Sequence, residues 1–405
     1  MRSFLFCGRL FTGFSINCSL KSGKVKMSTN KIGAFSQFDL NDLVSNGRIK
    51  TLNGFQNKHI GPASVDITVA DGEAYRVEHI VRPSGKRREK LRDLFGVLGA
   101  RKIELGTVLV PGEKYIAKAT INTNFPPGIY AYSNAKSTSG RNMCLCRTLA
   151  DEVEGYDTLD RRLEGWSGEV WLTIEPLVFP IVLTDKECYS QVRVFDGDTR
   201  FTESDLKDEL LRKDLLYRQD GSRYNQGELS LSSGDGTVFT TLYAKAGKLV
   251  GFRAKGTRKP LNLESRGLDP REYFEPVYAE TDPSDPDGGL ITLEPGWYYL
   301  LSTNEMLDVP EHLCAELVML HARFGLFFSH FAGFFDPGFK GVPTLEVTCL
   351  IRTTMRHREA VGCFRYERMR SETVSYASVG NYSGQQRTTL PKQFIMPEEW
   401  KLAMA

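Results

Sequence analysis

The chain has 405 residues and a nearly balanced charge, with 52 Lys or Arg against 50 Asp or Glu. This balance gives no bulk electrostatic reason to expect binding to nucleic acid or to a membrane surface, and neither partner is predicted. The hydrophobic content of 41% is typical of a soluble globular protein, and no apolar run approaches the roughly 20 residues of a membrane-spanning helix. Because 405 residues exceed one comfortable hydrophobic core, we expect two domains.

The spacing of cysteine and histidine argues against a metal site. The eight cysteines include no Cys-x-x-Cys, and the six histidines include no His-x-x-x-His pair. We therefore predict neither a structural zinc site nor a disulfide framework. This cysteine usage also favours a reducing, cytoplasmic setting.

The first 30 residues contain several basic residues and no acidic residue. Such a composition suits an organelle transit peptide, but a reading frame that truly starts at Met27 explains it equally well. We place residues 1–34 outside the fold, as a disordered or transit-like extension.

Three helices are predicted along the chain. The first begins with the capping-box pattern SQFD at residues 36–39 and has apolar residues at helical spacing up to Gly47. The second covers residues 91–98 and ends at Gly99. The third is a charged segment, Glu203 to Tyr217, which we interpret as a linking helix.

The rest of the sequence is typical of short β-strands. Residues 61–69 pass from a Gly-Pro turn into the alternation of a half-buried strand. From Ile103 to Phe195, runs of four to eight residues alternate with Gly- and Pro-containing turns. This rhythm predicts a β-barrel or sandwich and does not fit alternating βαβ units.

The second half of the chain repeats landmarks of the first half in the same order. The corresponding pairs are 108–112 with 291–296, 125–130 with 309–314, and 165–168 with 338–341. The repeat predicts two copies of one β-fold. We assign residues 35–202 to the first unit, 203–224 to a linker helix, and 225–397 to the second unit with a C-terminal arm.

One segment, KSTSGR at residues 136–141, concentrates a cation, hydroxyl groups, a glycine and a guanidinium. These are the groups that a phosphate or a polarised water needs. The alternative is an ordinary Ser/Gly β-turn with an exposed arginine. The segment precedes a Gly-Trp-Ser-Gly turn and a strand, which is a plausible layout for a binding site.

At this point the sequence resembles the dCTP deaminase branch of the dUTPase-like superfamily, in its long two-copy bacterial form. The matching segments are IGPASVDITV (60–69), AKSTSGR (135–141), EGWSGEVWLTIEP (164–176), KLVGFRAK (248–255), LDPREYFEP (268–276), FAGFFDPGFKG (331–341), TLEV (344–347) and NYSGQQ (381–386). The resemblance implies an all-β fold of two tandem distorted β-barrel (β-clip) units with a few short helices. It also implies a homo-oligomer with active sites between copies or subunits.

The activity that the resemblance implies is hydrolytic deamination of dCTP to dUTP and ammonia. Mg²⁺ then accompanies the triphosphate, and no zinc takes part. By the same resemblance, Ser137 and Arg141 hold the reacting water and the phosphates, and Lys136 and Thr138 contact the substrate.

The sequence departs from the family pattern at the catalytic glutamate, where Thr173 stands in the first copy. A threonine hydroxyl cannot shuttle protons as a carboxylate can. Two substitutes are available: Glu175 lies two residues further along the same strand face, and Glu346 occupies the family position in the second copy. Because the second copy lacks the serine segment, we expect a composite site of Ser137, Arg141 and Glu346.

The resemblance assigns further substrate contacts near the C-terminus. Phe331, Phe334 and Asp336 lie in the stretch that would cradle the cytosine, although Phe334 also fits a core strand and Asp336 a turn cap. Tyr382 and Gln385 resemble the arm that folds over the triphosphate.

Other functions remain open from the sequence. A dUTP diphosphatase or a bifunctional dCTP deaminase and dUTPase would share the fold, and a nucleotide-binding protein with a decayed site would explain Thr173. Zinc-dependent cytidine deaminases are disfavoured, because they need a His-x-Glu together with a Pro-Cys-x-x-Cys, and the chain contains no Pro-Cys-x-x-Cys.

Overall fold

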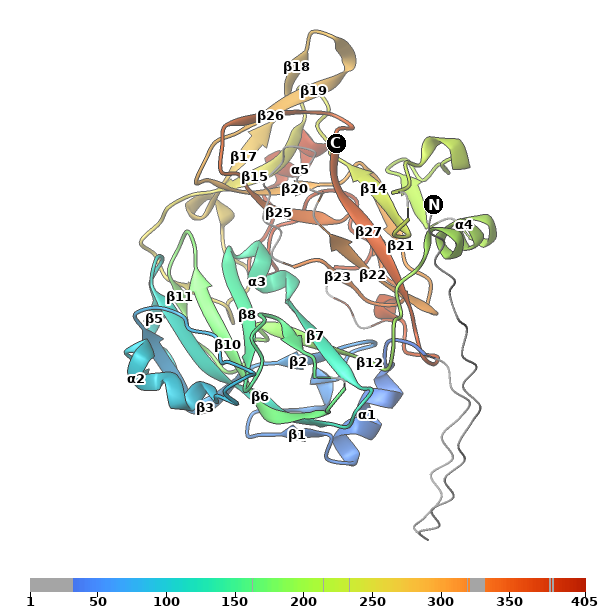
Figure 1. Cartoon of the computed structure of the whole chain (residues 1–405). Helices are drawn as coiled ribbons and strands as arrows, with labels where there is room; N and C mark the ends of the chain where they lie inside the picture. Colours follow the sequence, from blue (N-terminus) through green and yellow to red (C-terminus); the bar gives the residue numbers. More distant parts are fainter. Residues whose placement is uncertain are drawn as a thin grey trace, which may run out of the picture. The chain divides into compact units, whose positions relative to one another are not determined.

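Short, mostly antiparallel strands dominate the computed structural model (Figure 1). The structure describes residues 32–161, 163–213, 215–232, 234–318, 320, 332–378, 380 and 382–405. The predicted N-terminal extension therefore lies almost wholly outside the described residues. Within them, the prediction of an all-β fold with a few short helices is confirmed.

The first repeat contains three groups of paired strands. The largest sheet has the order β4 (Arg101–Ile103), β3 (Val69–Val77), β6 (Lys114–Phe125), β10 (Trp166–Pro176) and β8 (Cys144–Ala150), and β1 (Ile49–Thr51) also pairs with β6. A second sheet has the order β2 (Val65–Ile67), β12 (Ser190–Phe195), β7 (Tyr130–Ala135) and β9 (Thr158–Leu159). In addition, β5 (Val108–Leu109) pairs with β11 (Ile181–Val182).

The second repeat has the same order of pairing. The sheet β17 (Phe274–Tyr278), β15 (Leu249–Ala254), β20 (Tyr298–Ser302) and β25 (Thr344–Thr348) corresponds to β4-β3-β6-β10. The sheet β14 (Thr237–Thr241), β27 (Ala360–Arg368), β22 (Leu313–Val318) and β23 (Phe334–Phe335) corresponds to β2-β12-β7-β9. Likewise, β19 (Asp285–Leu293) pairs with β26 (Thr353–Arg356), and β18 (Glu280–Asp282) extends that pair. The internal repeat is thus a repeat of topology.

Each repeat begins with a helix followed by a short strand. Helix α1 (Gln37–Ser45) has the predicted capping box, in which the Ser36 hydroxyl accepts from the Asp39 amide and the Asp39 carboxylate accepts from the Ser36 amide. Helix α4 (Glu203–Arg212) has the same box and precedes β13 (Leu216–Arg218), which pairs with β21 (Glu305–Asp308) as β1 pairs with β6. The predicted helix to Tyr217 is therefore too long, because a strand begins at Leu216. On this topology we infer that α4 opens the second repeat.

The remaining elements are short. The predicted helix at 91–98 is a 3₁₀ turn (Leu91–Leu94) continued by α2 (Phe95–Leu98), and Gly99 ends it with a left-handed backbone at φ 61°. Strand β24 (Lys340–Gly341) pairs with β21, and β16 (Leu261–Asn262) pairs in parallel with β11. Helix α3 (Ser137–Arg141) lies in the first repeat, and α5 (Glu398–Met404) ends the chain.

Equivalent turns in the two repeats require glycine. Gly165 and Gly338 both have left-handed backbones, with φ of 76° and 81°. A methyl group on Gly165 would lie 2.8 Å from the Phe125 carbonyl oxygen, and one on Gly338 would lie 2.0 Å from the Ser375 hydroxyl. The sequence correspondence between 165–168 and 338–341 therefore has a conformational cause.

The two repeats share a hydrophobic core. One cluster of buried residues combines most of the first repeat with side chains from β15, β17 and the C-terminal segment. Its aromatic rings meet across the repeats: the ring centre of Phe179 lies 5.3 Å from that of Tyr273 and 5.8 Å from that of Phe274, both edge to face. The strand pair β11-β16 also joins the two repeats. The halves therefore bury apolar surface against each other.

A buried arginine also connects the repeats. Arg193 on β12 is 1% exposed, and its guanidinium pairs with Glu367 on β27 at 2.6 Å and with Glu316 on β22 at 3.4 Å. Its Nε donates to the Asn134 side chain at 3.0 Å, and the guanidinium carbon lies 4.5 Å from the centre of the Phe334 ring. Because a buried charge is costly without partners, these contacts fix how the two repeats meet.

We expect Phe274→Ala to destabilise both repeats together. Removing a fully buried ring leaves a cavity and should lower the free energy of unfolding by about 3–5 kcal/mol. Denaturant titration followed by signals from both repeats would measure this, and the signals should change in one shared transition. The matched control is Phe38→Ala, at a 59% exposed position on α1, which should change stability by about 0.5 kcal/mol or less. Separate transitions for the two repeats would contradict a shared core.

Candidate active site

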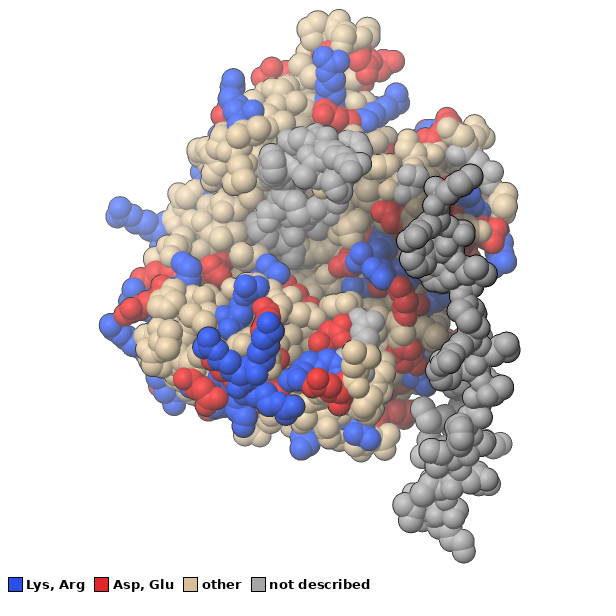
Figure 2. All heavy atoms as spheres, viewed as in Figure 1, with Lys and Arg blue, Asp and Glu red and all other residues tan. Residues whose placement is uncertain are grey.

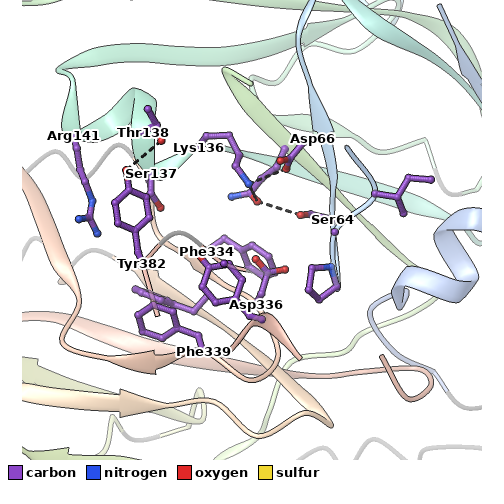
Figure 3. Close-up of a pocket in the computed structure, with 18 of the residues that line it drawn as sticks. Ser64, Asp66, Lys136, Ser137, Thr138, Arg141, Phe334, Asp336, Phe339 and Tyr382 are labelled. Atoms are coloured by element: carbon purple, nitrogen blue, oxygen red, sulfur yellow. Dashed lines mark hydrogen bonds and ion pairs between the residues drawn. The ribbon is translucent and has the colours of Figure 1, made fainter. Parts of the chain in front are cut away.

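A polar cavity of about 430 Å³ lies between the two repeats (Figure 3). The first repeat supplies residues from 57 to 66, α3 and the residue before it. The second repeat supplies residues around Phe334 and Glu346, and the C-terminal arm supplies Tyr376, Tyr382 and Gln385. The structure thus brings together segments that are more than 200 residues apart in the sequence.

The segment predicted as a catalytic loop is a short helix, α3. Lys136 precedes it, and the Asn142 side chain after it donates to the Thr138 carbonyl at 2.8 Å. The Ser139 hydroxyl donates to the Tyr189 carbonyl at 3.1 Å, which attaches the helix to the strand segment before β12. The segment is therefore a helix and not the β-turn considered from sequence, and Ser137 and Thr138 line the cavity.

Arg141 is buried at the end of α3 and is held by the C-terminal arm. Its Nη2 donates to the Gln385 side chain at 3.3 Å, and its Nη1 donates to the carbonyl of Thr389 at 3.3 Å and to its hydroxyl. The guanidinium carbon lies 4.0 Å from the centre of the Tyr382 ring, whose hydroxyl is 3.2 Å from the Thr138 hydroxyl. Tyr382 and Gln385 thus meet the predicted site, as Figure 3 shows for the tyrosine.

Lys136 lies in a network that the sequence analysis did not assign. Its Nζ is 2.8 Å from an Asp66 carboxylate oxygen and 3.2 Å from the Gln191 side-chain oxygen, to which Ser64 also donates. Burial alone would lower the pKa of Lys136, but the Asp66 and Asp336 carboxylates outweigh burial and raise it. Lys136 is therefore a permanent cation at the cavity wall. Asp66 lies within the segment 60–69, one of the segments that resemble the family. That match is the signal in the sequence from which Asp66 could have been identified.

Asp336 faces the same network. Burial raises the pKa of Asp336 to about 6, and the nearby Lys136 opposes that rise. The turn after it is closed by its main chain, because the Phe339 amide donates to the Asp336 carbonyl at 3.1 Å. Its carboxylate oxygen Oδ1 is buried without a hydrogen-bond partner among the described residues. The turn-cap interpretation of this side chain is therefore replaced by a place in the cavity wall.

Glu346 on β25 is 1% exposed and lines the cavity opposite α3. Burial raises the pKa of Glu346 to about 8, and the Arg141 charge opposes this rise. The Ala332 amide donates to its carboxylate at 3.3 Å. A methyl group built on Gly140 would lie 3.0 Å from the carboxyl carbon, so the helix backbone packs directly against this group. The three residues of the expected composite site line one cavity.

The rival carboxylate, Glu175, does not line this cavity. It lies on β10 opposite Leu145 of β8, near the charges of Lys114 and Arg147. Burial raises the pKa of Glu175, and those two cations oppose the rise. Thr173, at the family's catalytic position, is fully buried in the first repeat. The geometry therefore favours Glu346 over Glu175.

The aromatic part of the expected cradle is partly described. Phe334 lines the cavity and is 6% exposed, and Phe339 lies beside it in Figure 3. Phe331 lies outside the described residues.

The described part of the chain contains no group of three or more His, Cys, Asp and Glu side chains that could hold a metal ion. None of its helices is long and apolar enough to cross a membrane. On the face shown in Figure 2, Lys and Arg side chains gather over the first repeat with Asp and Glu side chains among them.

The tandem β-units and the polar cavity between them define a protein of the dUTPase-like fold class. Comparison with family models is more specific. Residues 31–198 match the 2'-deoxycytidine 5'-triphosphate deaminase (DCD) N-terminal domain, and residues 212–394 match the C-terminal domain. The chain therefore belongs to the dCTP deaminase family, as the resemblance predicted.

Two curated relatives match a short part of the chain, and one solved structure matches most of it. A stretch of 89 residues is 35% identical to a protein of Mycobacterium avium and 40% identical to one of Corynebacterium diphtheriae, both named "dCTP deaminase, dUMP-forming". Each match covers 22% of this chain and 46% of the relative, so the chain spans about half the length of these relatives. The crystal structure of 2'-deoxycytidine 5'-triphosphate deaminase from Agrobacterium tumefaciens has the same fold, with a TM-score of 0.75, 23% identity, and coverage of 85% of this chain and 97% of that one.

We expect Gly140→Ala to impair the site without changing its charged groups. The added methyl group would lie 3.0 Å from the Glu346 carboxyl carbon and 3.1 Å from the Ala332 side chain, so the carboxylate must shift. Nucleotide turnover should fall about ten- to a hundredfold, because small displacements of reacting groups are costly.

Steady-state kinetics on the folded variant would measure this effect. Gly96→Ala is the matched control, because Gly96 is also a helical glycine and a methyl group there meets no atom within 4 Å. Equal activity in the two variants would show that α3 does not pack against the reacting groups.

Proposed function

We propose that the protein catalyses hydrolytic deamination of dCTP to dUTP and ammonia. The observation that carries the proposal is the buried Glu346 carboxyl, with a pKa raised to about 8, in one cavity with Ser137 and Arg141. Family membership supports the choice of substrate, and the names of the curated relatives support the reaction.

Glu346 has the properties of a proton carrier for this reaction. In its ionised form it takes a proton from water as the water oxygen attacks C4 of the cytosine, and it delivers that proton to N3 of the ring. It then takes the remaining proton of the new C4 hydroxyl and delivers it to the 4-amino nitrogen, so that the C4–N bond breaks, ammonia leaves and the C4 carbonyl of uracil forms. A carboxyl group with a pKa near neutrality can act in both directions at neutral pH.

The first repeat supplies the positioning groups. Ser137 can hold the attacking water by its hydroxyl, and the Arg141 guanidinium offers fixed positive charge at the same wall of the cavity. Lys136 and the arm residue Tyr382, which line the same cavity, would contact the rest of the nucleotide. Mg²⁺ enters this proposal as part of the substrate complex, bound to the triphosphate.

A second candidate is a bifunctional enzyme that also hydrolyses dUTP to dUMP. The names of the relatives, "dCTP deaminase, dUMP-forming", favour this candidate. Incubation with dCTP and Mg²⁺, followed by chromatography of the nucleotides, separates the two: dUTP alone supports simple deamination, and dUMP with pyrophosphate supports the bifunctional reaction. Unchanged dCTP would contradict both. Homo-oligomer formation and a cytoplasmic location remain predictions.

We expect Glu346→Gln to lower kcat by about two to four orders of magnitude, because an amide cannot exchange protons with water and base. Affinity for dCTP should be largely retained, since the two side chains have the same shape. Single-turnover kinetics and equilibrium binding would separate the two effects. Glu175→Gln is the matched control and should keep most of the activity. Loss of activity in the Glu175 variant alone would assign the base to the first repeat.

We expect kcat/KM for dCTP to rise with pH and to level off above about 8. Glu346 must be ionised to accept the proton of water, and its pKa in the unliganded protein is about 8. A pH–rate profile of the wild type would show this rise, and the residual activity of Glu346→Gln should lack it.

The stability of the protein should show the opposite trend. The folded state keeps Glu346 protonated where the unfolded chain has lost the proton, so its contribution to the free energy of unfolding falls as pH rises from about 4.5 to 8. Glu346→Gln should remove this part of the pH dependence. An unchanged pH dependence of stability would show that the pKa of Glu346 is not raised.

A further inference from the structure

A second large cavity lies within the second repeat, away from the candidate active site. It has a volume of about 620 Å³, and its walls come from the segment after β13, the ends of β14 and β21, and the turn between β26 and β27. Four cationic side chains line it: Arg218, Lys245, Arg358 and Arg387. Three carboxylates, those of Asp220, Glu228 and Glu305, line it as well.

The acidic side chains of this cavity are already engaged. Glu305 accepts from the Thr240 hydroxyl and from the Thr241 amide and hydroxyl at 2.6–2.8 Å. Glu228 pairs with Arg218 at 2.6 Å. Asp220, the remaining acid, accepts from the Ser222 amide at 2.8 Å.

The other three cations have no carboxylate partner among the described residues, and the four cations of the wall exceed its three carboxylates by one charge. Over the described ranges of the chain, the side chains of Lys245, Arg358 and Arg387 form no ion pair. Positive charge is therefore left at the cavity wall, as a polyanionic ligand would need.

Buried polar groups of the same wall also lack partners. His357 is 8% exposed; its Nδ1 accepts from the Ala244 amide at 3.1 Å, so the neutral ring carries its proton on Nε2. That nitrogen has no partner within the described residues, and the same holds for the Tyr224 hydroxyl and Arg387 Nε. A buried donor without a partner costs free energy, so these three groups mark an unsatisfied part of the wall.

A smaller and more apolar cavity of about 340 Å³ adjoins this one. The two share wall residues such as Tyr224 and Arg358, and the smaller one adds Leu229, Phe239 and Ala360. An organic phosphate has an anionic end and a less polar organic end. A cationic compartment beside an apolar one suits both ends.

We propose that the two cavities form a binding site for a phosphorylated organic anion of nucleotide size. The phosphate groups would lie between Lys245, Arg358 and Arg387. The planar organic part would enter the compartment lined by Tyr224 and Phe239.

Arg387 connects this site to the candidate active site. It lies in the C-terminal arm between Gln385 and Thr389, and both of these residues accept hydrogen bonds from Arg141. A phosphate bound by Arg387 would order the arm segment 385–389 and therefore the position of Arg141. This coupling rests on the proposed function, whereas the binding site itself does not.

Titration calorimetry on the full chain tests the site, with inorganic tripolyphosphate and ATP as probes. In Lys245→Ala/Arg358→Ala, affinity for ATP should fall about tenfold or more, because two charge-assisted contacts are lost. The matched control is Lys248→Ala/Arg356→Ala, which removes the same charge two or three residues away and outside the cavity. The control should bind as the wild type does, and ATP should bind more tightly than tripolyphosphate.

Two results would overturn the site. Equal affinity of the two double variants for ATP would place the nucleotide elsewhere, and equal binding of tripolyphosphate and ATP would remove the organic compartment from the proposal. Hydrogen exchange tests the coupling without any assay of activity. ATP should slow exchange of the amides at 385–389 in the wild type and not in Lys245→Ala/Arg358→Ala, and unchanged exchange in the wild type would overturn the coupling.

Discussion

The burial of Arg193 between the repeats is the constraint on which the candidate site depends. A guanidinium that is 1% exposed must find its partners inside the protein, and both carboxylates come from the other repeat. Those carboxylates lie on β22 and β27, and β22 also pairs with β23, which carries Phe334 of the cavity wall. Because a buried ion pair gives little net stability, its effect is best described as specificity: only one docking of the repeats satisfies all these charges.

This docking explains why two incomplete repeats can form one complete cavity. The first repeat has the serine and arginine of α3 but a buried threonine at position 173, whose hydroxyl has no hydrogen-bond partner among the described residues. The second repeat has Glu346 at the corresponding place on β25. The cavity holds the residues of α3 together with one carboxylate, that of Glu346. A second glutamate at position 173 of the first repeat is therefore not needed for this cavity.

Local features of the fold were predictable from the sequence, and long-range features were less so. The capping box at Ser36, the left-handed Gly99 and the paired turns at Gly165 and Gly338 depend on a few adjacent residues, and the structure has all of them. The helical form of α3 was missed, because its side-chain bonds reach Tyr189 and residues beyond the segment itself. The end of α4 was placed too late, because pairing of Leu216 with Leu307 starts a strand there.

The candidate site shows the same difference between what adjacent residues predict and what depends on distant ones. Ser137, Arg141 and Glu346 could be named from sequence through matched motifs, but the partners of Lys136 and Arg141 could not. Asp66 and Gln191 come from separate strands, and Thr389 lies 248 residues from Arg141, so no local pattern predicts these contacts. The raised pKa of Glu346 depends on its burial by both repeats, which only the packed structure reveals.

The covalent connection of the repeats has a consequence for how the site assembles. In a protein where such groups lie on different subunits, the complete cavity exists only above the dissociation constant of the oligomer. Here α3 and β25 belong to one chain, so the effective concentration of one wall near the other is set by the polypeptide and its shared core. The cavity is therefore present in every folded molecule, however far the protein is diluted.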